Sequence, residues 1–423
     1  MKIAIVSPYP PSKGTLNEYA FHLIKQFKFK HDIEEIIILT DKIDETYTVP
    51  ESESTCKVTI KAIWSFNALS NIYNIAKAVK ACEADVVLYN IQFLSFGDKK
   101  IQAAVGLMTP LLTRILGVPS VVLLHNIVET VNYESAGITN NPVMKFLYTM
   151  VGTILTRIVL MANLVAVTMP KYVDILEKKY KCKNVALIPH GSFELPPLPN
   201  FELADGPKKI MTFGKFGTYK KVEKMIEAVE MVRKSTGQDL EIVIAGTDNP
   251  NVAGYLDSVK EKYSHVPKIK FTGYVEEEDV PKIFTESAVV VFEYTSTTGS
   301  SGVLHQAGSY GKAVILPNIG DLKELIEEEG YCGEFFKAND VNDLAKAIKK
   351  LVVDDAHRQT LAKKNYTAAA SLPMSDIADW YMMHFNYLKK KNHFSKPSIS
   401  PLNKSQRIRK TNKPAKMATN ISV

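Results

Sequence analysis

The most informative stretch of the chain reads Thr298-Gly299-Ser300-Ser301-Gly302-Val303-Leu304-His305-Gln306. Apolar runs at 289–292 and 313–317 flank it, and both have the length and composition of buried strands. The glycine–serine turn therefore opens a helix between two strands. Small residues let a ligand approach the backbone, and the free N–H groups of a first helical turn favour phosphate. We expect an anionic ligand here, although an ordinary serine-capped connection would explain the same residues.

Short apolar runs alternate with longer helical patterns along the whole chain, which is typical of a parallel sheet with helices on both faces. In the first half we expect strands at 3–7, 33–39, 57–63, 85–89, 120–125 and 164–168, and helices at 17–27, 71–82, 99–116 and 143–162. In the second half we expect strands at 209–214, 241–245 and 269–272, and helices at 221–235, 252–263, 278–286, 321–328, 341–353 and 356–371.

A proline-dense connection, Leu195-Pro196-Pro197-Leu198-Pro199-Asn200, separates the two halves. It suits an interdomain link because proline neither continues a helix nor donates to a sheet ladder. We therefore predict an α/β protein with two doubly wound Rossmann-like domains, 1–194 and 195–373, that face each other across a cleft. A helix with an apolar face follows at 374–392. The basic tail at 393–423 has few large apolar residues, which predicts disorder.

Composition and charge exclude several classes of protein. The chain has 423 residues and a hydrophobic fraction of 46%, as expected for a globular protein with sizeable cores. From Lys389 onward there are ten Lys and Arg and no Asp or Glu, so a net charge of +7 leaves −3 for the rest. No basic patch with interleaved aromatic residues lies outside the tail, and we expect no nucleic-acid partner. The tail fits either a solvated segment or one that binds an anionic membrane surface.

Other features of the sequence concern the cellular compartment of the protein. The four cysteines lack the spacing of metal sites or disulfide frameworks, which predicts reduced thiols in a cytosolic protein. Met1 leads directly into a strand pattern, without the features of a signal peptide. The apolar run 143–162 contains Lys145 and Arg157. It fits a core helix, or an interfacial helix that would indicate a lipid-linked acceptor. The prediction is a cytoplasmic protein, with peripheral attachment to the inner face of the cell membrane left open.

Several motifs together resemble nucleotide-sugar glycosyltransferases of the GT-B fold, and within it the retaining family-4 enzymes (glycosyltransferase group 1). The resemblance covers the chain from Met1 to about residue 388 and rests on the order and spacing of its motifs. Its landmarks are an opening strand with a loop ending at Gly14, a strand that leads to His125, Ile188-Pro189-His190-Gly191 in place of I-P-N-G, Phe213-Gly214-Lys215-Phe216 with Lys220 in place of G-R-x-x-x-x-K, and the runs 271–275 and 311–315.

The chain departs from this family at two positions. The family usually places two glutamates eight residues apart around the glycine turn, and these positions hold Thr298 and Gln306 here. The resemblance implies that residue 306 holds the donor's ribose hydroxyls, and Gln306 can accept with its carbonyl and donate with its amide. Thr298 would contact the transferred sugar, but it is short and uncharged and gives less help to a positively charged transition state. Glu293, at the end of the preceding strand, is an alternative source of a carboxylate.

The resemblance also implies a phosphate site. Lys215 and Lys220 would neutralise the leaving diphosphate, although a solvated pair of lysines is the ordinary explanation. The helix N-terminus would assist them through four donor-binding residues: Gly299, Ser300, Ser301 and Gly302. Asp-x-Asp is absent from the sequence, so we expect neither a metal nor a cofactor, and the nucleoside-diphosphate sugar is a substrate.

Two residues of the first half receive roles from the same resemblance. His125 would hydrogen-bond the donor sugar near the reacting carbon, at the carboxyl end of a parallel strand where open sheets place ligand groups. Gly14 would bring backbone N–H groups near the donor sugar or the acceptor. A core histidine and a glycine at a helix entry are the ordinary alternatives for these two positions. His305 fits packing beside the turn better than chemistry.

The function that follows is a retaining glycosyltransferase acting on a glycan or a lipid-linked glycan, as in polysaccharide biosynthesis. By resemblance, the leaving phosphate would help to deprotonate the acceptor on the same face of the sugar. Loss of both glutamates favours a pseudoenzyme that binds glycan or nucleotide without turnover, whereas His125, Lys215 and Lys220 oppose it. A nicotinamide-dependent oxidoreductase is disfavoured because residues 7–14 lack G-x-G-x-x-G.

Overall fold

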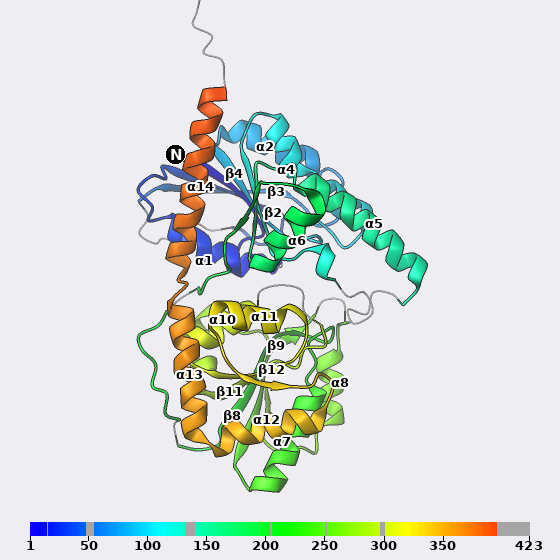
Figure 1. Ribbon diagram of the computed structural model, residues 1–423, viewed down its shortest axis with the longest axis vertical. Coiled ribbons are helices and arrows are strands. Elements are labelled where there is room, and N and C mark those ends of the chain that lie inside the picture. The colour runs from blue at the N-terminus through cyan, green and yellow to red at the C-terminus, as the bar shows by residue number, and fades with distance from the viewer. Residues whose placement is uncertain are drawn as a thin grey trace, which may run out of the picture.

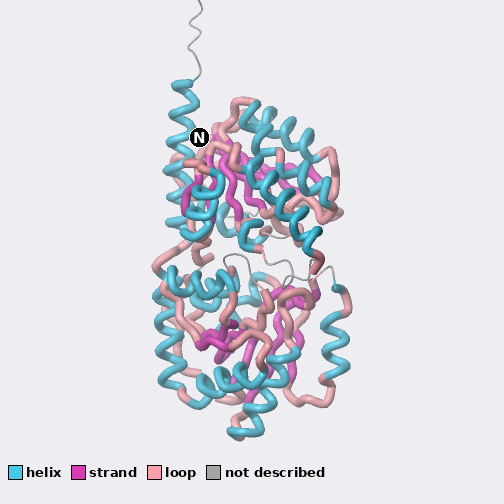
Figure 2. The backbone as a smooth tube through the Cα atoms, turned by 45° about the vertical axis from the view of Figure 1, so that its right-hand side comes forward, coloured by secondary structure: helices cyan, strands magenta, loops and turns pink. Residues whose placement is uncertain are grey.

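The computed structural model describes residues 1–14, 16–47, 55–131, 140–193, 195–203, 205–249, 252–296 and 301–395. Within these ranges the chain forms two α/β domains, stacked along the long axis of the molecule (Figure 1). Figure 2 shows strands in the middle of each domain and helices around them. The predicted fold class, two doubly wound Rossmann-like domains, is therefore confirmed.

The first domain is built on a seven-stranded parallel sheet with the order β3-β2-β1-β4-β5-β6-β7. Its strands are β1 (Lys2–Val6), β2 (Glu35–Asp41), β3 (Lys57–Trp64), β4 (Val86–Ile91), β5 (Ser120–Leu124), β6 (Leu164–Val167) and β7 (Val185–Leu187). Its helices are α1 (Asn17–Phe27), α2 (Asn71–Cys82), α3 (Lys100–Leu107), α4 (Thr109–Ile115), η1 (Val128–Thr130), α5 (Pro142–Val159) and α6 (Pro170–Tyr180). The strand order reverses beside β1, where Ile3 pairs with Ile36 on one side and Val86 on the other. Such a reversal opens a crevice at the carboxyl ends of the strands.

The second domain repeats this logic with a six-stranded parallel sheet in the order β10-β9-β8-β11-β12-β13. Its strands are β8 (Lys208–Phe216), β9 (Leu240–Asp248), β10 (Ile269–Phe271), β11 (Ser287–Val291), β12 (Ala313–Pro317) and β13 (Glu334–Phe336). Its helices are α7 (Glu223–Thr236), α8 (Tyr255–Lys262), η3 (Glu277–Asp279), α9 (Val280–Glu286), α10 (Gly302–Ser309), α11 (Gly320–Glu329), α12 (Val341–Val353) and α13 (Asp355–Ala370). Met211 of β8 pairs with Val243 and Val290, so here the reversal lies beside β8.

Helices cover both faces of each sheet, and the central strands are buried accordingly. β4, β5, β6, β11 and β12 are buried along their whole length, which explains their nearly continuous apolar sequences. Asp340 and Asp354 begin the last two helices of the second domain, because their side chains accept from the N–H groups of Asp343 and His357 at 3.0 and 2.9 Å.

The last helix, α14 (Met374–Ser395), leaves the second domain and packs on the first (Figure 1). Tyr381 and Phe385 lie with ring centres 6.2 and 5.9 Å from that of Phe27 in α1. Lys389 forms an ion pair with Asp85 at 3.0 Å, just before β4. The predicted helix therefore exists and runs to Ser395, and it ties the two domains together. The remainder of the predicted tail, 396–423, lies outside the described residues.

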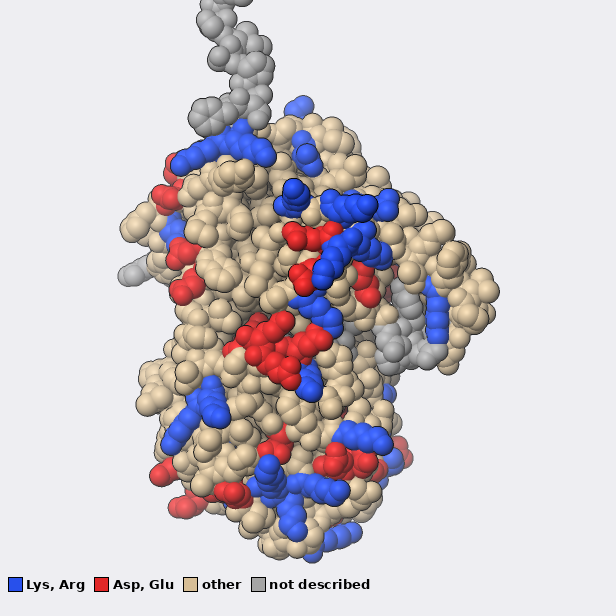
Figure 3. All heavy atoms as spheres, viewed as in Figure 1, with Lys and Arg blue, Asp and Glu red and all other residues tan. Residues whose placement is uncertain are grey.

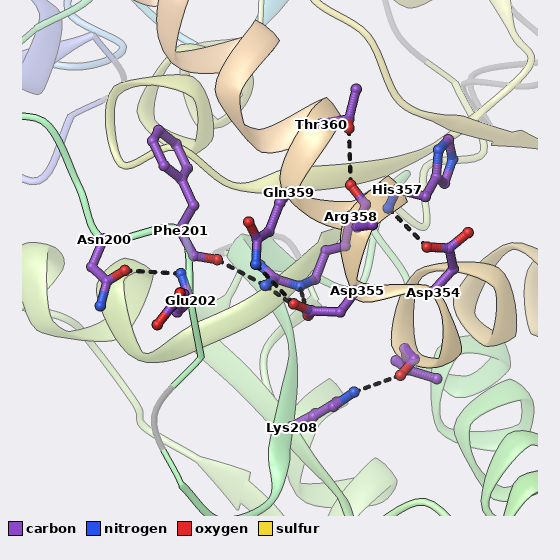
Figure 4. A network of polar contacts seen from close by, with 12 residues as sticks. Asn200, Phe201, Glu202, Lys208, Asp354, Asp355, His357, Arg358, Gln359 and Thr360 are labelled. Carbon is purple, nitrogen blue, oxygen red and sulfur yellow. Dashed lines mark hydrogen bonds and ion pairs between the residues drawn. The ribbon is translucent and has the colours of Figure 1, made fainter.

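A buried arginine anchors the connection between the domains (Figure 4). Arg358 of α13 is only 2% exposed, and its Nη2 donates to the Phe201 carbonyl at 2.8 Å. Its Nε donates to Asp355 at 2.9 Å, and the same carboxylate accepts from Gln359. Lys208, at the start of β8, donates to the carbonyl of Val352 at 2.6 Å. These bonds fix the path by which the chain enters the second domain.

Two parts of the predicted element list were wrong. The helix expected over 99–116 is broken into α3 and α4, because Pro110 lies in the first turn of α4 and cannot continue α3. α6, β7 and β13 were not predicted. α6 buries only Tyr172 and Leu176 among many charged residues, which makes a weak periodic signal, and β7 and β13 have only three residues each.

Candidate functional site

Loops and helices that follow the carboxyl ends of the strands meet at the interface between the domains. α1 follows β1, and it faces α10 and η3 of the second domain. Gln306 Nε2 in α10 donates to Glu18 Oε1 in α1 at 2.6 Å. His22 Nε2, one turn further along α1, lies 3.1 Å from Glu277 Oε1. Elements that follow strand ends in the two sheets therefore contact each other at this interface, and the strand ends of doubly wound sheets are where ligands usually bind.

His125 stands at the end of β5 and is oriented by Asn90. The Asn90 amide nitrogen donates to Ser7 Oγ at 2.9 Å and to the Leu16 carbonyl at 3.2 Å. Its Oδ1 is therefore the acceptor that lies 2.6 Å from His125 Nε2. Since this nitrogen must carry the proton, Nδ1 is the acceptor of a neutral His125 ring. Asn90 is a polar residue inside an apolar strand, which is only a weak signal at the level of sequence.

Three histidines form a row from the first domain to the second. The ring of Tyr19 lies 4.7 Å from His125 and 4.9 Å from His190, and His190 stacks on His305 at 4.7 Å. Burial lowers the pKa of His190 to about 4. Burial and the neighbouring His190 also lower the pKa of His125 and of His305 well below the ordinary range. All three rings are therefore neutral at pH 7.

Lys215 and Lys220 extend from the carboxyl end of β8 and the loop after it. Lys215 Nζ donates to the Lys13 carbonyl of the first domain at 3.2 Å. Lys220 Nζ lies 4.9 Å from the ring centre of Tyr294. Desolvation lowers the pKa of Lys215; the Glu18 carboxylate opposes this shift and Lys220 adds to it. The two cations and Glu18 thus act on one another in a single region of the interface.

Gln306 is 7% exposed and lies on α10, one turn after the N-terminus of that helix. Its partner Glu18 comes from the opposite domain, which sequence reasoning missed. Burial raises the pKa of Glu18, and the charge of Glu277 adds to the increase. His22, the hydrogen bond from Gln306, and Lys220 lower it. The spacing of Glu18 and His22 could have indicated their common orientation, because residues i and i+4 share one face of a helix.

The predicted phosphate turn is only partly described. Gly302 is the first residue of α10, and Ser301 precedes it. A Cβ on Gly302 would stand 3.7 Å from Nε2 of His190, so that imidazole faces the start of the helix. The other predicted residues of the turn lie outside the described residues: Thr298, Gly299 and Ser300.

Gly14 ends the loop after β1, as expected. Its N–H donates to Ser12 Oγ at 3.1 Å, and an added Cβ would stand 2.9 Å from the Cβ of Pro8. The close approach to Pro8 explains the glycine by packing alone. Its neighbour Lys13 supplies the carbonyl that accepts from Lys215, so this loop does reach the second domain.

Glu293 does not supply a carboxylate to this region. It is 5% exposed, and its Oε2 accepts from the N–H of Met225 at 3.2 Å. The charges that act on it come from Glu223, Lys224 and Glu227, all in α7. Glu293 therefore caps the start of α7, and the alternative carboxylate considered from the sequence points elsewhere.

Glu18, His22 and Glu277 each offer one possible metal-ligand atom, and these atoms lie within 4.8 Å of one another. Each already has a protein partner, since Glu18 accepts from Gln306 and His22 pairs with Glu277. Pairing across the domain interface accounts for the cluster without an ion.

α5 stands out from the first domain and exposes apolar side chains (Figure 1). Among the described residues it is the one helix with the length and mean hydropathy of a membrane span, and 17% of it is buried. Lys100 in α3 donates to Tyr148 at 2.9 Å, so α5 packs on the domain surface. Figure 3 shows few charges over its outer part. Its exposed apolar residues are Val143, Phe146, Leu147, Met150, Val151 and Ile154.

Comparison with known proteins shows what the second domain is similar to. Residues 199–368 match the family model of glycosyl transferases group 1. This match includes Lys215, Lys220, Gln306 and the whole glycine–serine turn. The predicted resemblance to this group is confirmed, and the match supports a glycosyltransferase. No curated protein sequence matches the chain significantly.

Solved structures share the fold of both domains. Sucrose-phosphate synthase from Thermosynechococcus elongatus superimposes with a TM-score of 0.70 at 17% identity, covering 92% of this chain and 100% of that one. Anabaena HepE in complex with UDP-glucose gives a TM-score of 0.64 at 15% identity, with 92% and 100% coverage. WaaG, a glycosyltransferase involved in lipopolysaccharide biosynthesis, gives 0.62 at 12% identity, with 91% and 99% coverage. The chain has the GT-B fold.

Proposed function

We propose that this protein is a retaining glycosyltransferase that moves a sugar from a nucleoside-diphosphate sugar to a glycan or lipid-linked glycan. One observation carries the proposal. Lys215 and Lys220 follow a strand end in a domain that matches glycosyl transferases group 1, and both act on Glu18 of the first domain, which accepts from Gln306 in α10. Two ammonium groups beside a helix start form a suitable place for a diphosphate.

The chemistry assigned to each residue follows from charge and protonation. Lys215 and Lys220 stabilise the negative charge that develops as the diphosphate leaves. His125 is neutral and fixed by Asn90, so its Nδ1 accepts a hydrogen bond from a hydroxyl of the donor sugar and the ring cannot act as a cationic acid. The leaving phosphate takes the proton of the acceptor hydroxyl. Thr298 contacts the transferred sugar in this proposal.

Ligands bound by structurally similar proteins indicate which nucleotide-sugar donors to test first. The structures of HepE contain UDP or UDP-glucose, and an E. coli relative is bound with UDP-2-fluoro glucose. We therefore place UDP and UDP-glucose first among the probes for this chain. Neutralisation by two lysines also leads us to propose transfer without a metal, and full activity in the presence of EDTA would support it.

The decisive measurement is thermal unfolding of the full chain with nucleoside diphosphates and their sugar conjugates. A ligand at 100 times its Kd stabilises the fold by about 2.7 kcal/mol. In domains of this size that is a shift of about 5–10 °C. We expect one nucleotide to stand out and Lys215→Ala with Lys220→Ala to abolish its effect. No shift with any nucleotide at millimolar concentration would contradict the proposal. Binding without transfer or hydrolysis would support the glycan- or nucleotide-binding pseudoenzyme instead.

We further propose a cytoplasmic protein that lies at the inner face of the membrane through α5 and the basic tail. Apolar side chains such as Phe146 and Ile154 are 68% and 51% exposed, with Lys145 among them. An interfacial helix of this kind binds through apolar burial and attraction to anionic lipid, and the ten cations from Lys389 onward add attraction.

Sedimentation with vesicles containing phosphatidylglycerol tests this location. Phe146→Asp with Ile154→Asp should release the protein from the vesicles. Leu198→Asp is a matched control because Leu198 is 72% exposed but lies in the interdomain connection. Equal binding by both variants, or no binding by the unmodified chain, would refute the membrane proposal.

A further inference from the structure

A cavity of about 530 Å³ lies at the edge of the first sheet where the strands begin, opposite to the proposed donor site. Its walls come from the end of α4, the chain after α5, the starts of β6 and β7, and α14. A smaller hollow of about 200 Å³ shares four of its wall residues and reaches Pro119, just before β5. His125 stands at the other end of β5, a strand of five residues that spans about 17 Å. This basal cavity has the size of an ordinary ligand pocket and is separate from the donor site.

Three cations and no acidic residue line the basal cavity. Arg114 comes from α4, Lys183 from the turn before β7, and Lys391 from the last turns of α14. Neither Arg114 nor Lys183 has a carboxylate partner among the residues that the structure describes. By contrast, Lys389 on the same helix pairs with Asp85 at 3.0 Å. An anion bound among the three cations of the cavity would offset their mutual repulsion.

Two polar side chains in the wall are held in place by bonds of their own. Arg114 Nη1 donates to the carbonyl of Met161 at 2.6 Å, which leaves the other guanidinium nitrogens as donors. Asn163 Oδ1 accepts from the N–H of Ser120 at 3.0 Å, so its amide nitrogen is a further donor. Fixed donors of this kind suit a phosphate group, since a guanidinium matches two phosphate oxygens at once.

The carbonyl groups at the end of α5 are the ordinary explanation for cations in this place. Arg114 bonds one of these carbonyls, and Asn184 donates to those of Leu160 and Ala162 at 2.9 Å each. Lys183 makes no such bond within the described part of the chain. The helix end therefore accounts for Arg114 and leaves the charge of Lys183 unexplained.

The rest of the cavity wall is apolar. Tyr387 of α14 is 62% exposed and lines the cavity, so an aromatic face is open to a ligand. A ligand with a carbon body beside its phosphate can therefore bury apolar surface here. The aliphatic residues of the wall are Leu160, Ala162, Leu164, Val185, Ala186 and Leu388.

We propose that the basal cavity binds an organic phosphate, that is, a phosphate group carried on a small carbon body. The phosphate accepts hydrogen bonds from Arg114, Lys183 and the amide of Asn163, and Lys391 adds positive charge. The carbon body packs against Tyr387. A soluble sugar phosphate and the headgroup of phosphatidic acid both carry this chemistry. Because α14 forms one wall and the first domain forms the others, the ligand also stabilises the packing of α14 on that domain.

Isothermal titration of the full chain with glucose 6-phosphate, glycerol 3-phosphate and uncharged glucose tests the site. Arg114→Gln with Lys183→Gln removes two charged donors and should raise the Kd of the organic phosphates by about 10- to 100-fold. Lys77→Gln with Lys80→Gln is the matched control, since it removes the same charge from exposed positions of α2 outside the cavity. The control should leave each Kd within about twofold. Equal losses in the two double variants, or equal binding of glucose, would overturn the proposal.

The proposed donor site also attracts phosphate, so the same titration is repeated with Lys215→Ala and Lys220→Ala combined. We expect the Kd of the organic phosphates to stay within about twofold of that of the unmodified chain. A loss of binding in this variant, with none in Arg114→Gln with Lys183→Gln, would place the phosphate in the donor site and overturn the proposal.

Sedimentation with phosphatidylcholine vesicles that contain phosphatidic acid distinguishes the two sources of phosphate. A lipid source predicts that Arg114→Gln with Lys183→Gln weakens vesicle binding while Lys77→Gln with Lys80→Gln does not. A soluble source predicts equal vesicle binding by these variants, with the loss confined to the titrations. If the unmodified chain binds neither soluble phosphate at millimolar concentration, and vesicle binding is the same in both double variants, the basal cavity is not a phosphate site.

Discussion

Glu293→Gln tests quantitatively how a buried carboxyl makes the stability of the second domain depend on pH. Glu293 lies close to, but outside, the proposed site. Burial raises its pKa to about 8, and Glu223 and Glu227 add to the effect, while the N–H of Met225 and Lys224 oppose it. The folded protein therefore keeps a proton on Glu293 at neutral pH. In the unfolded chain a glutamate has a pKa of about 4.3 and has lost that proton.

The stability that this carboxyl contributes is complete below the pKa of the unfolded chain and is lost as pH rises toward 8. Between pH 6.5 and pH 8 the folded state binds more protons than the unfolded state, so the free energy of unfolding falls by about 1.5 kcal/mol for this group. Glu329, with a pKa also raised to about 8 by burial and the charge of Glu328, contributes a similar loss. His125, His190 and His305 act in the opposite direction, and since an unfolded histidine is half protonated at about pH 6.5, they together offset about 1 kcal/mol of this loss between pH 6.5 and pH 8.

Urea unfolding at pH 6.5, 7.25 and 8 measures this slope. We expect Glu293→Gln to make the decrease smaller by about 1.5 kcal/mol, since glutamine keeps the hydrogen bond from Met225 and cannot ionise. Glu329→Gln is the matched control and should make the decrease smaller by a similar amount. An unchanged slope in Glu293→Gln would refute the burial argument. Loss of nucleotide binding in this variant would show that Glu293 does belong to the site.

Three other changes have defined outcomes. Asn90→Ala removes the acceptor that orients His125 and should lower the transfer rate about 10- to 100-fold with little change in nucleotide affinity; an unchanged rate would show that His125 needs no such support. Arg358→Met leaves the connection between the domains unanchored and should cost about 2 kcal/mol, seen as a fall of about 4–8 °C in Tm; a smaller fall would mean that the buried guanidinium contributes little. Gly14→Ala forces a Cβ against Pro8 and should cost about 1–2 kcal/mol in urea unfolding. Pro8→Gly in the same chain removes the Cβ at position 8 and should recover most of that loss, and failure to do so would place the strain elsewhere.

Strong local periodicity explains which elements could be predicted. The bounds of α1, α2 and α12 agree with the predicted ranges, since each has a clear apolar stripe. α6 has only two buried side chains, and its apolar stripe is interrupted by lysines and acidic residues. The closely spaced prolines at 196–199 indicated the interdomain connection. Pro110, inside the single helix predicted over 99–116, was not recognised as the break between α3 and α4.

The residues of the candidate site also differ in whether the sequence alone could indicate them. The sequence indicated His125 because parallel strands bring their carboxyl ends to one edge, and it indicated Lys215 and Lys220 through the resemblance to G-R-x-x-x-x-K. Glu18 and Asn90 could not be placed, since each matters only through the residue it contacts. The sequence left Glu293 as an alternative carboxylate, and only its contact with Met225 shows where it points.

The sequence by itself determined the two doubly wound sheets, the edge at which a ligand would bind and the resemblance to group 1 glycosyltransferases, because these depend on local patterns and short motifs. Only the tertiary structure decided that α14 packs on the first domain and that Glu18 stands beside Gln306. The physical reason is that such contacts depend on how two independently wound domains dock. No local pattern encodes the position of a side chain relative to one that lies 288 residues away.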